Sequence, residues 1–166
     1  MKRRSLRRLA DSSIWIAFYR IGRFEVLLKL PNIAIARPAL RELRLGSDDL
    51  PDRVQDALAD DCFDLDVSNS VSDTLGNILG VKDRRLSQAD AAQVAYACHH
   101  SDRTVLYMRD GPAERQAKQI GAPVRNHEAL VEDMVELQVV TLEEGADLRR
   151  QLDVYFAKRR EGKRLA

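Results

Sequence analysis

At 166 residues, the chain is long enough to bury the hydrophobic core of one domain. Apolar residues make up 45% of it and charged residues 32%, a balance that excludes an intrinsically disordered chain. The formal net charge of +1 gives no overall attraction to nucleic acid, and no segment approaches the ~18 apolar residues of a membrane span.

The first half of the chain predicts three strands separated by helices. Residues 6–11 (LRRLAD) predict a short strand that ends at Asp11, and residues 33–36 (IAIA) form an apolar run typical of a buried strand. Residues 63–67 (FDLDV) alternate apolar and acidic side chains, as a half-buried strand does. The apolar spacing predicts helices at residues 13–21, 24–30, 38–43 and 70–79, and within residues 46–61.

The second half predicts two more strands, again between helices. Ser87 is a good N-cap for a helix whose alanine-rich surface suits close packing on a sheet. Residues 104–108 (TVLYM) predict a strand by their β-branched and aromatic content, and residues 122–124 predict a short one. Further helices are expected at residues 113–120, 127–138 and 143–160, and a loop at residues 82–85.

Strands that alternate with helices predict an α/β fold with three layers, α/β/α, around a central, mainly parallel sheet. In such sheets, the residues just past the carboxyl ends of the strands gather in one crevice. Asp11 and Asp110 both follow predicted strands, so the sequence places them there. We expect a single domain over residues 1–166, with a basic N-terminal segment at 1–8 and a helical C-terminal extension at about 127–160.

Four acidic residues stand at the mouths of predicted strands or at the starts of adjoining helices. Each also has a local structural explanation. Asp11 could cap the next helix, and Asp90 stands three residues after Ser87, the spacing of a capping box. Glu42 could be an exposed helical residue, and aspartate is common in turns such as that of Asp110. Their common placement favours a shared site.

Four segments together resemble the PIN domain, a family of metal-dependent ribonucleases that includes the toxins of VapC-type toxin–antitoxin pairs. The matching words, in chain order, are ADSSIWIAFYRIGRFEVL at 10–27, IAIARPALREL at 33–43, LSQADAAQVAYA at 86–97 and TVLYMRDGPAERQAKQIGAPV at 104–124. The opening DSS and the long C-terminal extension also resemble an uncharacterised PIN-like subgroup. Order and spacing agree over residues 6–124, which is most of the chain.

The resemblance implies that Asp11, Glu42, Asp90 and Asp110 are the catalytic, metal-binding acids of a ribonuclease that hydrolyses RNA phosphodiesters. Carboxylate oxygens are the ligands that Mg²⁺ and Mn²⁺ prefer, and such ions activate water and neutralise phosphoryl charge. Ser13 would donate a hydrogen bond that orients a metal-binding carboxylate. Without metal, clustered carboxylates repel one another, so the pKa of at least one of them should rise.

Partners follow from the same resemblance: an RNA substrate, a homodimer and an antitoxin that covers the acidic site. A cytoplasmic location is expected from the residues, because Cys62 and Cys98 offer no disulfide framework and no secretory signal is recognised. Arg109 and Arg115 are the candidate phosphate contacts near the acids. Basic residues also gather at both ends, at 2–8 and 158–164, and such clusters either bind phosphates or remain solvated tails.

Two departures from the family pattern keep an alternative open. Met108 stands where the family usually has threonine or serine, and residues 125–130 (RNHEAL) replace a glycine–threonine turn. These changes favour a catalytically weak module that binds nucleic acid or protein. A third hypothesis is a helix-rich interaction protein whose acids are only helix caps. Arg7 and Arg8 in the first predicted strand also need partners, since an unpaired buried charge is costly.

Overall fold

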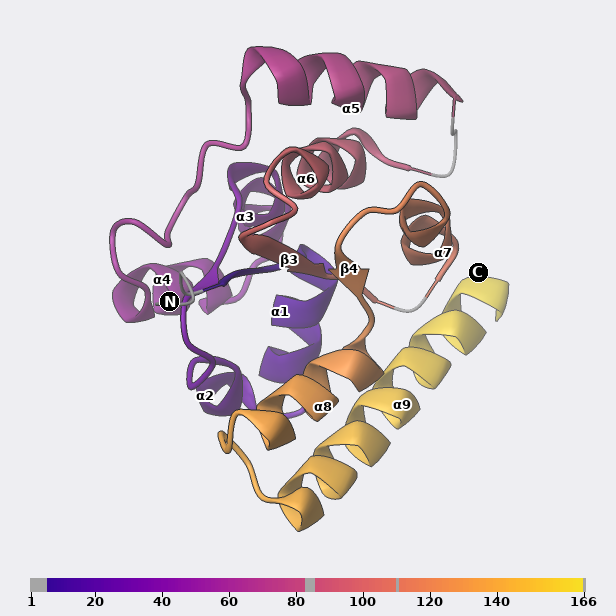
Figure 1. The fold of residues 1–166 in the computed structure, drawn as a ribbon. Helices are drawn as coiled ribbons and strands as arrows, with labels where there is room; N and C mark the ends of the chain where they lie inside the picture. The colour runs from indigo at the N-terminus through magenta and orange to yellow at the C-terminus, as the bar shows by residue number, and fades with distance from the viewer. Residues whose placement is uncertain (1–5, 83–85, 110, 166) are drawn as a thin grey trace.

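Four short strands form one parallel sheet with the order β2-β1-β3-β4, so that β1 and β3 lie at its centre (Figure 1). This computed structural model describes residues 6–82, 86–109 and 111–165, and of the last three only the backbone. The strands are β1 (Arg7–Ala10), β2 (Ile33–Ala34), β3 (Thr104–Tyr107) and β4 (Val124–Arg125). The parallel sheet confirms the predicted α/β class.

Helices cover both faces of the sheet, which gives the expected three layers (Figure 1). Along β3, Val105 and Tyr107 face the core under α1 (Ser12–Arg20), α8 (His127–Glu136) and α9 (Leu142–Leu165), whereas Leu106 faces the core under α6 (Gln88–His99) and α7 (Pro112–Gln119). Helix α5 packs on the outer side of α6. In chain order, the helices of the described residues are α1 (Ser12–Arg20), α2 (Phe24–Leu27), α3 (Arg37–Arg44), α4 (Leu50–Ala57), α5 (Ser70–Lys82), α6 (Gln88–His99), α7 (Pro112–Gln119), α8 (His127–Glu136) and α9 (Leu142–Leu165).

The strand predicted at residues 63–67 is wrong. Leu65 makes only an isolated parallel bridge to Ala36. The backbone of Asp64 has a positive φ of 52°, which interrupts an extended run. Arg37 pairs with Asp64 at 3.1 Å and with Asp66 at 3.6 Å, so the alternating acids are ion-pair partners rather than the solvated face of a strand.

The remaining predicted elements form, with shifted ends. Helices α5 and α9 are longer than predicted, α2 is shorter, and α4 lies within the range expected for it. The predicted loop at 82–85 and the basic segment at 1–8 fall mostly outside the described residues, because 1–5 and 83–85 are not described. None of the described helices is long and apolar enough to span a membrane.

Arg8, in the central strand, is mostly buried, with its side chain 12% exposed, and its partner Asp133 is 14% exposed. Its Nη1 donates to the hydroxyl of Tyr107 at 2.6 Å, and that hydroxyl donates to Asp133 Oδ2 at 2.8 Å. Arg125 Nη2 donates to the other oxygen of Asp133 at 2.9 Å. One carboxylate from α8 therefore compensates two arginines, which removes the cost that an isolated arginine would bring to a central strand.

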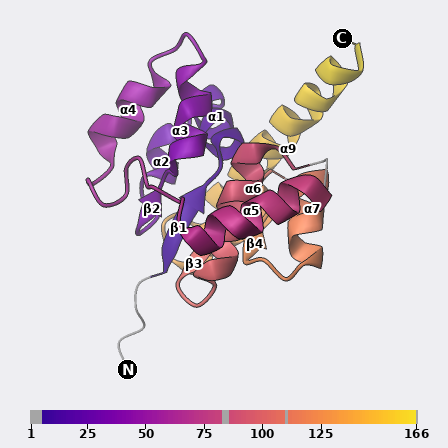
Figure 2. The ribbon, with the colours of Figure 1, turned by 90° about the horizontal axis from the view of Figure 1, so that it is seen from above.

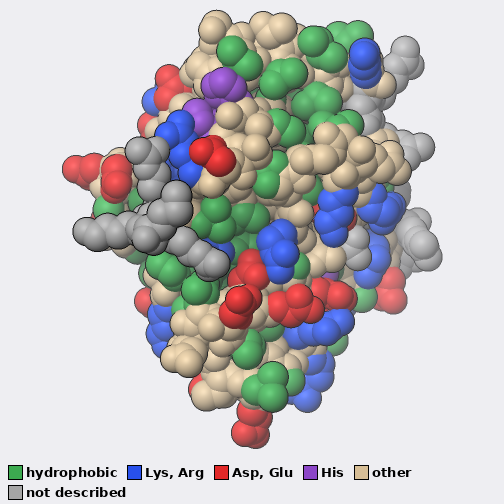
Figure 3. Space-filling view, viewed as in Figure 1, with side chains coloured by type: hydrophobic (Ala, Val, Ile, Leu, Met, Phe, Trp, Pro, Cys, Tyr) green, Lys and Arg blue, Asp and Glu red, His purple; other side chains and the backbone are tan. Residues whose placement is uncertain are grey.

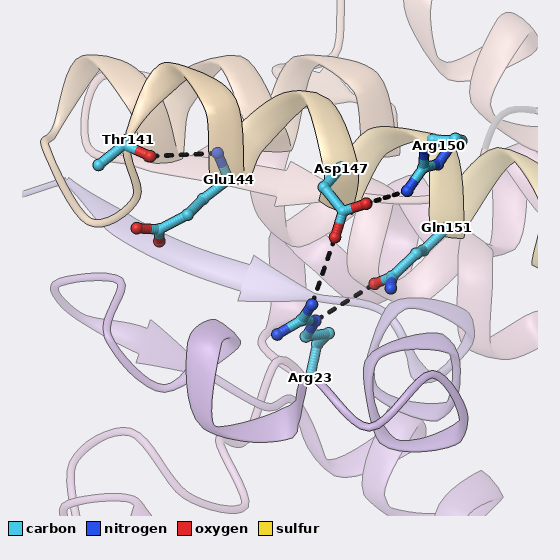
Figure 4. Close-up of polar contacts among 6 residues, drawn as sticks. All are labelled: Arg23, Thr141, Glu144, Asp147, Arg150 and Gln151. Carbon is cyan, nitrogen blue, oxygen red and sulfur yellow. Dashed lines mark hydrogen bonds and ion pairs between the residues drawn. The ribbon is translucent and has the colours of Figure 1, made fainter.

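Helix α9 is anchored to the body along its first half (Figure 4). Thr141 directly precedes the helix, and its Oγ1 accepts a hydrogen bond from the Glu144 amide at 3.1 Å. Arg23 donates to Gln151 at 3.2 Å and to Asp147 at 3.3 Å. These contacts fix the direction in which the rest of α9 runs.

Candidate active site

Asp11 follows the central strand β1 and is 7% exposed. Its amide donates to the carbonyl of Tyr107 at 2.9 Å, which extends the pairing of β1 with β3 by one residue. Although Asp11 occupies the N-cap position of α1, its side chain makes no capping hydrogen bond. The carboxylate instead accepts a hydrogen bond from Ser13 Oγ at 2.9 Å, the contact expected of an orienting donor.

Gln93 is a partner of Asp11 that sequence reasoning missed. Its side chain is fully buried on α6, and its Nε2 donates to Asp11 Oδ1 at 3.0 Å and to the Ala89 carbonyl at 3.3 Å. Its Oε1 has no hydrogen-bond partner in the described part of the chain. The available signal was a glutamine three residues after Asp90, on an otherwise apolar stretch of the same helix.

Glu42 is held next to the start of α1. Ser12 Oγ donates to Glu42 Oε2 at 2.5 Å. Burial raises the pKa of the Glu42 carboxyl, and the nearby charge of Asp11 raises it further, while the hydrogen bond from Ser12 opposes both effects. Glu42 is therefore half-buried beside a like charge, not an exposed residue on the outer side of α3.

Asp90 lies in the first turn of α6 and serves two roles. The hydroxyl of Ser87 caps the helix by accepting a hydrogen bond from the Asp90 amide at 3.1 Å, as predicted. Burial raises the pKa of the Asp90 carboxyl to about 7, with further increases from the charges of Asp11 and Glu42, and hydrogen bonds from Ser87 lower it. Asp90 is thus both part of a helix cap and electrostatically coupled to the other acids.

Two of the predicted acids border a cavity of about 530 Å³. A separate cavity of about 600 Å³ lies between α5 and α6, and none of the predicted acids that the structure describes lines it. Asp11 and Asp90 face the first cavity, and Glu42 does not line it. Arg109 lines the cavity, whereas Arg115 lies on α7 outside its wall. The remaining lining residues are Ser13, Met108, Gly111, Pro112 and Ala113. Asp110, the fourth predicted acid, is outside the described residues.

The three described acids do not form a tight ligand set. Among described residues, the group whose possible ligand atoms all lie within 4.8 Å of one another is His127, Glu128 and Asp153, which Arg149 already bridges at 3.0 Å from Glu128. At the predicted site the donor chemistry still fits a hard cation, because carboxylates and the unpartnered Gln93 amide oxygen are all oxygen ligands. Mg²⁺ usually takes only one or two carboxylates and keeps several waters.

The two departures from the family pattern have structural roles. Met108 is buried, and its amide donates to the Arg125 carbonyl at 3.0 Å, so its side chain forms an apolar wall of the cavity. In the altered turn, Asn126 caps α8 by accepting from the Ala129 amide at 2.9 Å. His127 is buried and lies 2.7 Å from Asp153. The turn at 125–130 therefore secures the junction of β4 with α8.

The raised pKa of Asp90 predicts how stability depends on pH without metal. An unfolded aspartate has a pKa of ~3.9, so between pH 4 and 7 the folded protein keeps a proton that the unfolded chain releases. This contribution is complete below about pH 4 and is lost as the pH rises through about 7. Urea unfolding in chelator should show a steeper loss of stability from pH 5 to 8 for the wild type than for Asp90→Asn. Parallel curves for the two proteins would show that Asp90 titrates normally.

No protein-family model matches this chain, and no curated protein matches it with significance. The site described above therefore stands on its own residues and their geometry.

Proposed function

We propose that this chain is a metal-dependent ribonuclease of the PIN type, in which Asp11, Glu42, Asp90 and Asp110 act on RNA phosphodiesters with Mg²⁺ or Mn²⁺. The observation that carries the proposal is the environment of Asp11. Its carboxylate lies past the end of the central strand and is oriented by Ser13 and Gln93, and its charge adds to the effect of burial in raising the pKa of both Glu42 and Asp90. A role as a helix cap does not explain why two side chains donate hydrogen bonds to the buried carboxylate of Asp11.

Each side chain has a role in this proposal. Asp11 and Asp110 would hold the metal directly, and Glu42 and Asp90 would complete the site as ligands or through bound water. Ser13 and Gln93 keep the Asp11 carboxylate in one orientation. A bound divalent ion supplies an activated water and neutralises negative charge on the phosphoryl oxygens. Arg109, at the cavity wall, would contact a phosphate of the substrate.

RNA rather than DNA as substrate rests on the family resemblance, as do a homodimer and an antitoxin partner. The proposal of a cytoplasmic location rests on the two cysteines, which offer no disulfide framework. The competing proposal is a module that binds RNA or protein without efficient cleavage. The buried Met108 favours it, because a thioether at the cavity wall cannot orient a ligand or a water as a hydroxyl would.

Cleavage and thermal stability measured together test the proposal. The wild type should cut single-stranded RNA in millimolar Mg²⁺ or Mn²⁺, and EDTA should abolish the cleavage. Metal at about ten times its Kd should add about 1.4 kcal/mol and raise Tm by roughly 3–6 °C. RNA binding without cleavage under any metal condition would favour the binding module, and cleavage that persists in EDTA would exclude the proposed chemistry.

A further inference from the structure

The last part of α9 projects beyond its own packing surface. Leu148, Leu152 and Phe156 are buried at helical spacing, but every described side chain at 157–162 is exposed. We call residues 157–165 the C-terminal arm. At 1.5 Å per residue the arm adds about 13 Å of helix, and its described side chains, at 157–162, include no buried apolar residue. Its sequence is therefore not explained by packing within the chain.

The C-terminal arm lies on the side of the molecule where the candidate active site lies. All four strands are parallel, and the acids follow or adjoin their carboxyl ends. In both ribbon views, α9 runs toward the side to which the strands point and extends past them there (Figure 1, Figure 2). Lys and Arg side chains gather on the same side of the molecule, over α7 and the C-terminal end of α9 (Figure 3).

The positive charge of the C-terminal arm is not neutralised within the described structure. The sequence of 157–165 is AKRREGKRL, with five basic residues and one acidic one. In the described part of the chain, Lys158 and Arg160 have no ion-pair partner, and Arg159 contacts the hydroxyl of Tyr155 at 3.5 Å. Some arginines of the body are paired, as Arg53 is with Glu25 at 3.2 Å.

A cationic surface next to this site meets a requirement of the proposed chemistry. The acidic side chains in and beside the crevice disfavour a phosphodiester, and among the described residues that line the cavity Arg109 is the cation. A strand of RNA therefore needs positive charge beside the crevice to remain bound. We propose that the C-terminal arm binds the phosphate backbone of the RNA that enters the crevice, an inference that rests on the proposed ribonuclease function.

The test compares RNA binding by two triple variants, both made in the cleavage-deficient Asp11→Asn protein. The arm variant carries Lys158→Gln, Arg159→Gln and Arg160→Gln, which keep good helix formers on an exposed surface. The control variant carries Arg20→Gln, Lys29→Gln and Arg44→Gln, three exposed cations at the ends of segments that run back from the active-site side. Net charge changes equally in both, and circular dichroism should show unchanged helix content.

Fluorescence anisotropy with a labelled 20-nucleotide single-stranded RNA, in EDTA at 50 to 200 mM salt, gives the affinity and its salt dependence. Three lost phosphate contacts should reduce the slope of log K against log salt by about 2 and weaken binding about tenfold or more at 50 mM salt. The control variant should bind like the parent. Equal affinity and slope for the arm variant and the parent would overturn the proposal, as would a parent that binds no RNA.

Cleavage by the same arm substitutions in a chain that keeps Asp11 separates this inference from the proposed function. An increase in KM with little change in kcat supports the C-terminal arm as a binding surface. Metal-dependent cleavage with an unchanged kcat/KM overturns the arm while the nuclease stands. Arm-dependent RNA binding without any cleavage supports the arm and rejects the nuclease.

Discussion

Replacement of Asp11 by asparagine is expected to lower metal-dependent RNA cleavage by at least ~10³-fold, because a site that loses its central anionic ligand forfeits several kcal/mol of transition-state stabilisation. Asparagine preserves the size of the side chain and an oxygen that can still accept from Ser13 or Gln93. The fold should therefore survive. In chelator, the Tm of the variant should equal or exceed that of the wild type, since the like-charge repulsion with Glu42 and Asp90 is removed.

The matched control for Asp11→Asn is Asp56→Asn, which removes one negative charge from an exposed position on α4. Its cleavage rate and its metal-induced rise in Tm should match those of the wild type. The rise in Tm should disappear in Asp11→Asn. Cleavage by Asp11→Asn within tenfold of the wild type would show that Asp11 does not hold the metal, and the proposed site would have to be abandoned.

The layered fold could be predicted from the sequence because it depends on local patterns. The apolar runs at 33–36 and 104–108 form strands, and the small residues of α6 pack on the sheet, as their spacing indicates. The alternation at 63–67 led to a wrong prediction. A period-2 pattern indicates which side chains can face water, but it does not indicate whether a neighbouring strand will form hydrogen bonds with the segment. Arg37, which follows β2, instead forms ion pairs with both acids of this segment, Asp64 and Asp66.

The site could be predicted only in part. Its acids can be recognised because they follow predicted strands or lie in adjoining helices, whereas some of the side chains that hydrogen-bond to them are far away in the sequence. The strand pattern predicts that Asp11 follows β1, as it does. Glu42 and Asp90 lie near it, and its charge adds to the effect of burial in raising the pKa of both. Gln93 lies 82 positions from Asp11, and nothing local marks its amide as a donor to that carboxylate. The same holds for His127, whose partner Asp153 is 26 positions away on another helix. Hydrogen bonds between side chains of different helices and strands depend on tertiary packing, which the periodic pattern of apolar residues does not predict.

Replacement of Asp133 by alanine is expected to destabilise the fold by about 3–5 kcal/mol, the usual cost of breaking a buried ion pair from one side. Arg8 and Asp133 are only 12% and 14% exposed, so water cannot replace the lost carboxylate. The variant leaves the hydroxyl of Tyr107 without its acceptor and Arg8 without the carboxylate that lies 3.9 Å from it. Tm should fall by roughly 6–20 °C, measured by calorimetry or circular dichroism.

Two comparisons isolate the cause of that loss. Glu25→Ala removes the partner of Arg53 from an exposed pair, 42% and 74% accessible, and should cost less than ~1 kcal/mol. The double change Arg8→Met with Asp133→Leu removes the two least exposed charges and should recover part of the loss, because Arg125, whose side chain is 41% exposed, can be solvated. A loss of stability below ~1 kcal/mol in Asp133→Ala would show that Arg8 is solvated in another way.

Asp133 is linked to the candidate active site indirectly, through Tyr107, whose carbonyl accepts a hydrogen bond from the Asp11 amide. We therefore expect the cleavage rate of Asp133→Ala, measured at low temperature where the variant stays folded, to fall less than that of Asp11→Asn.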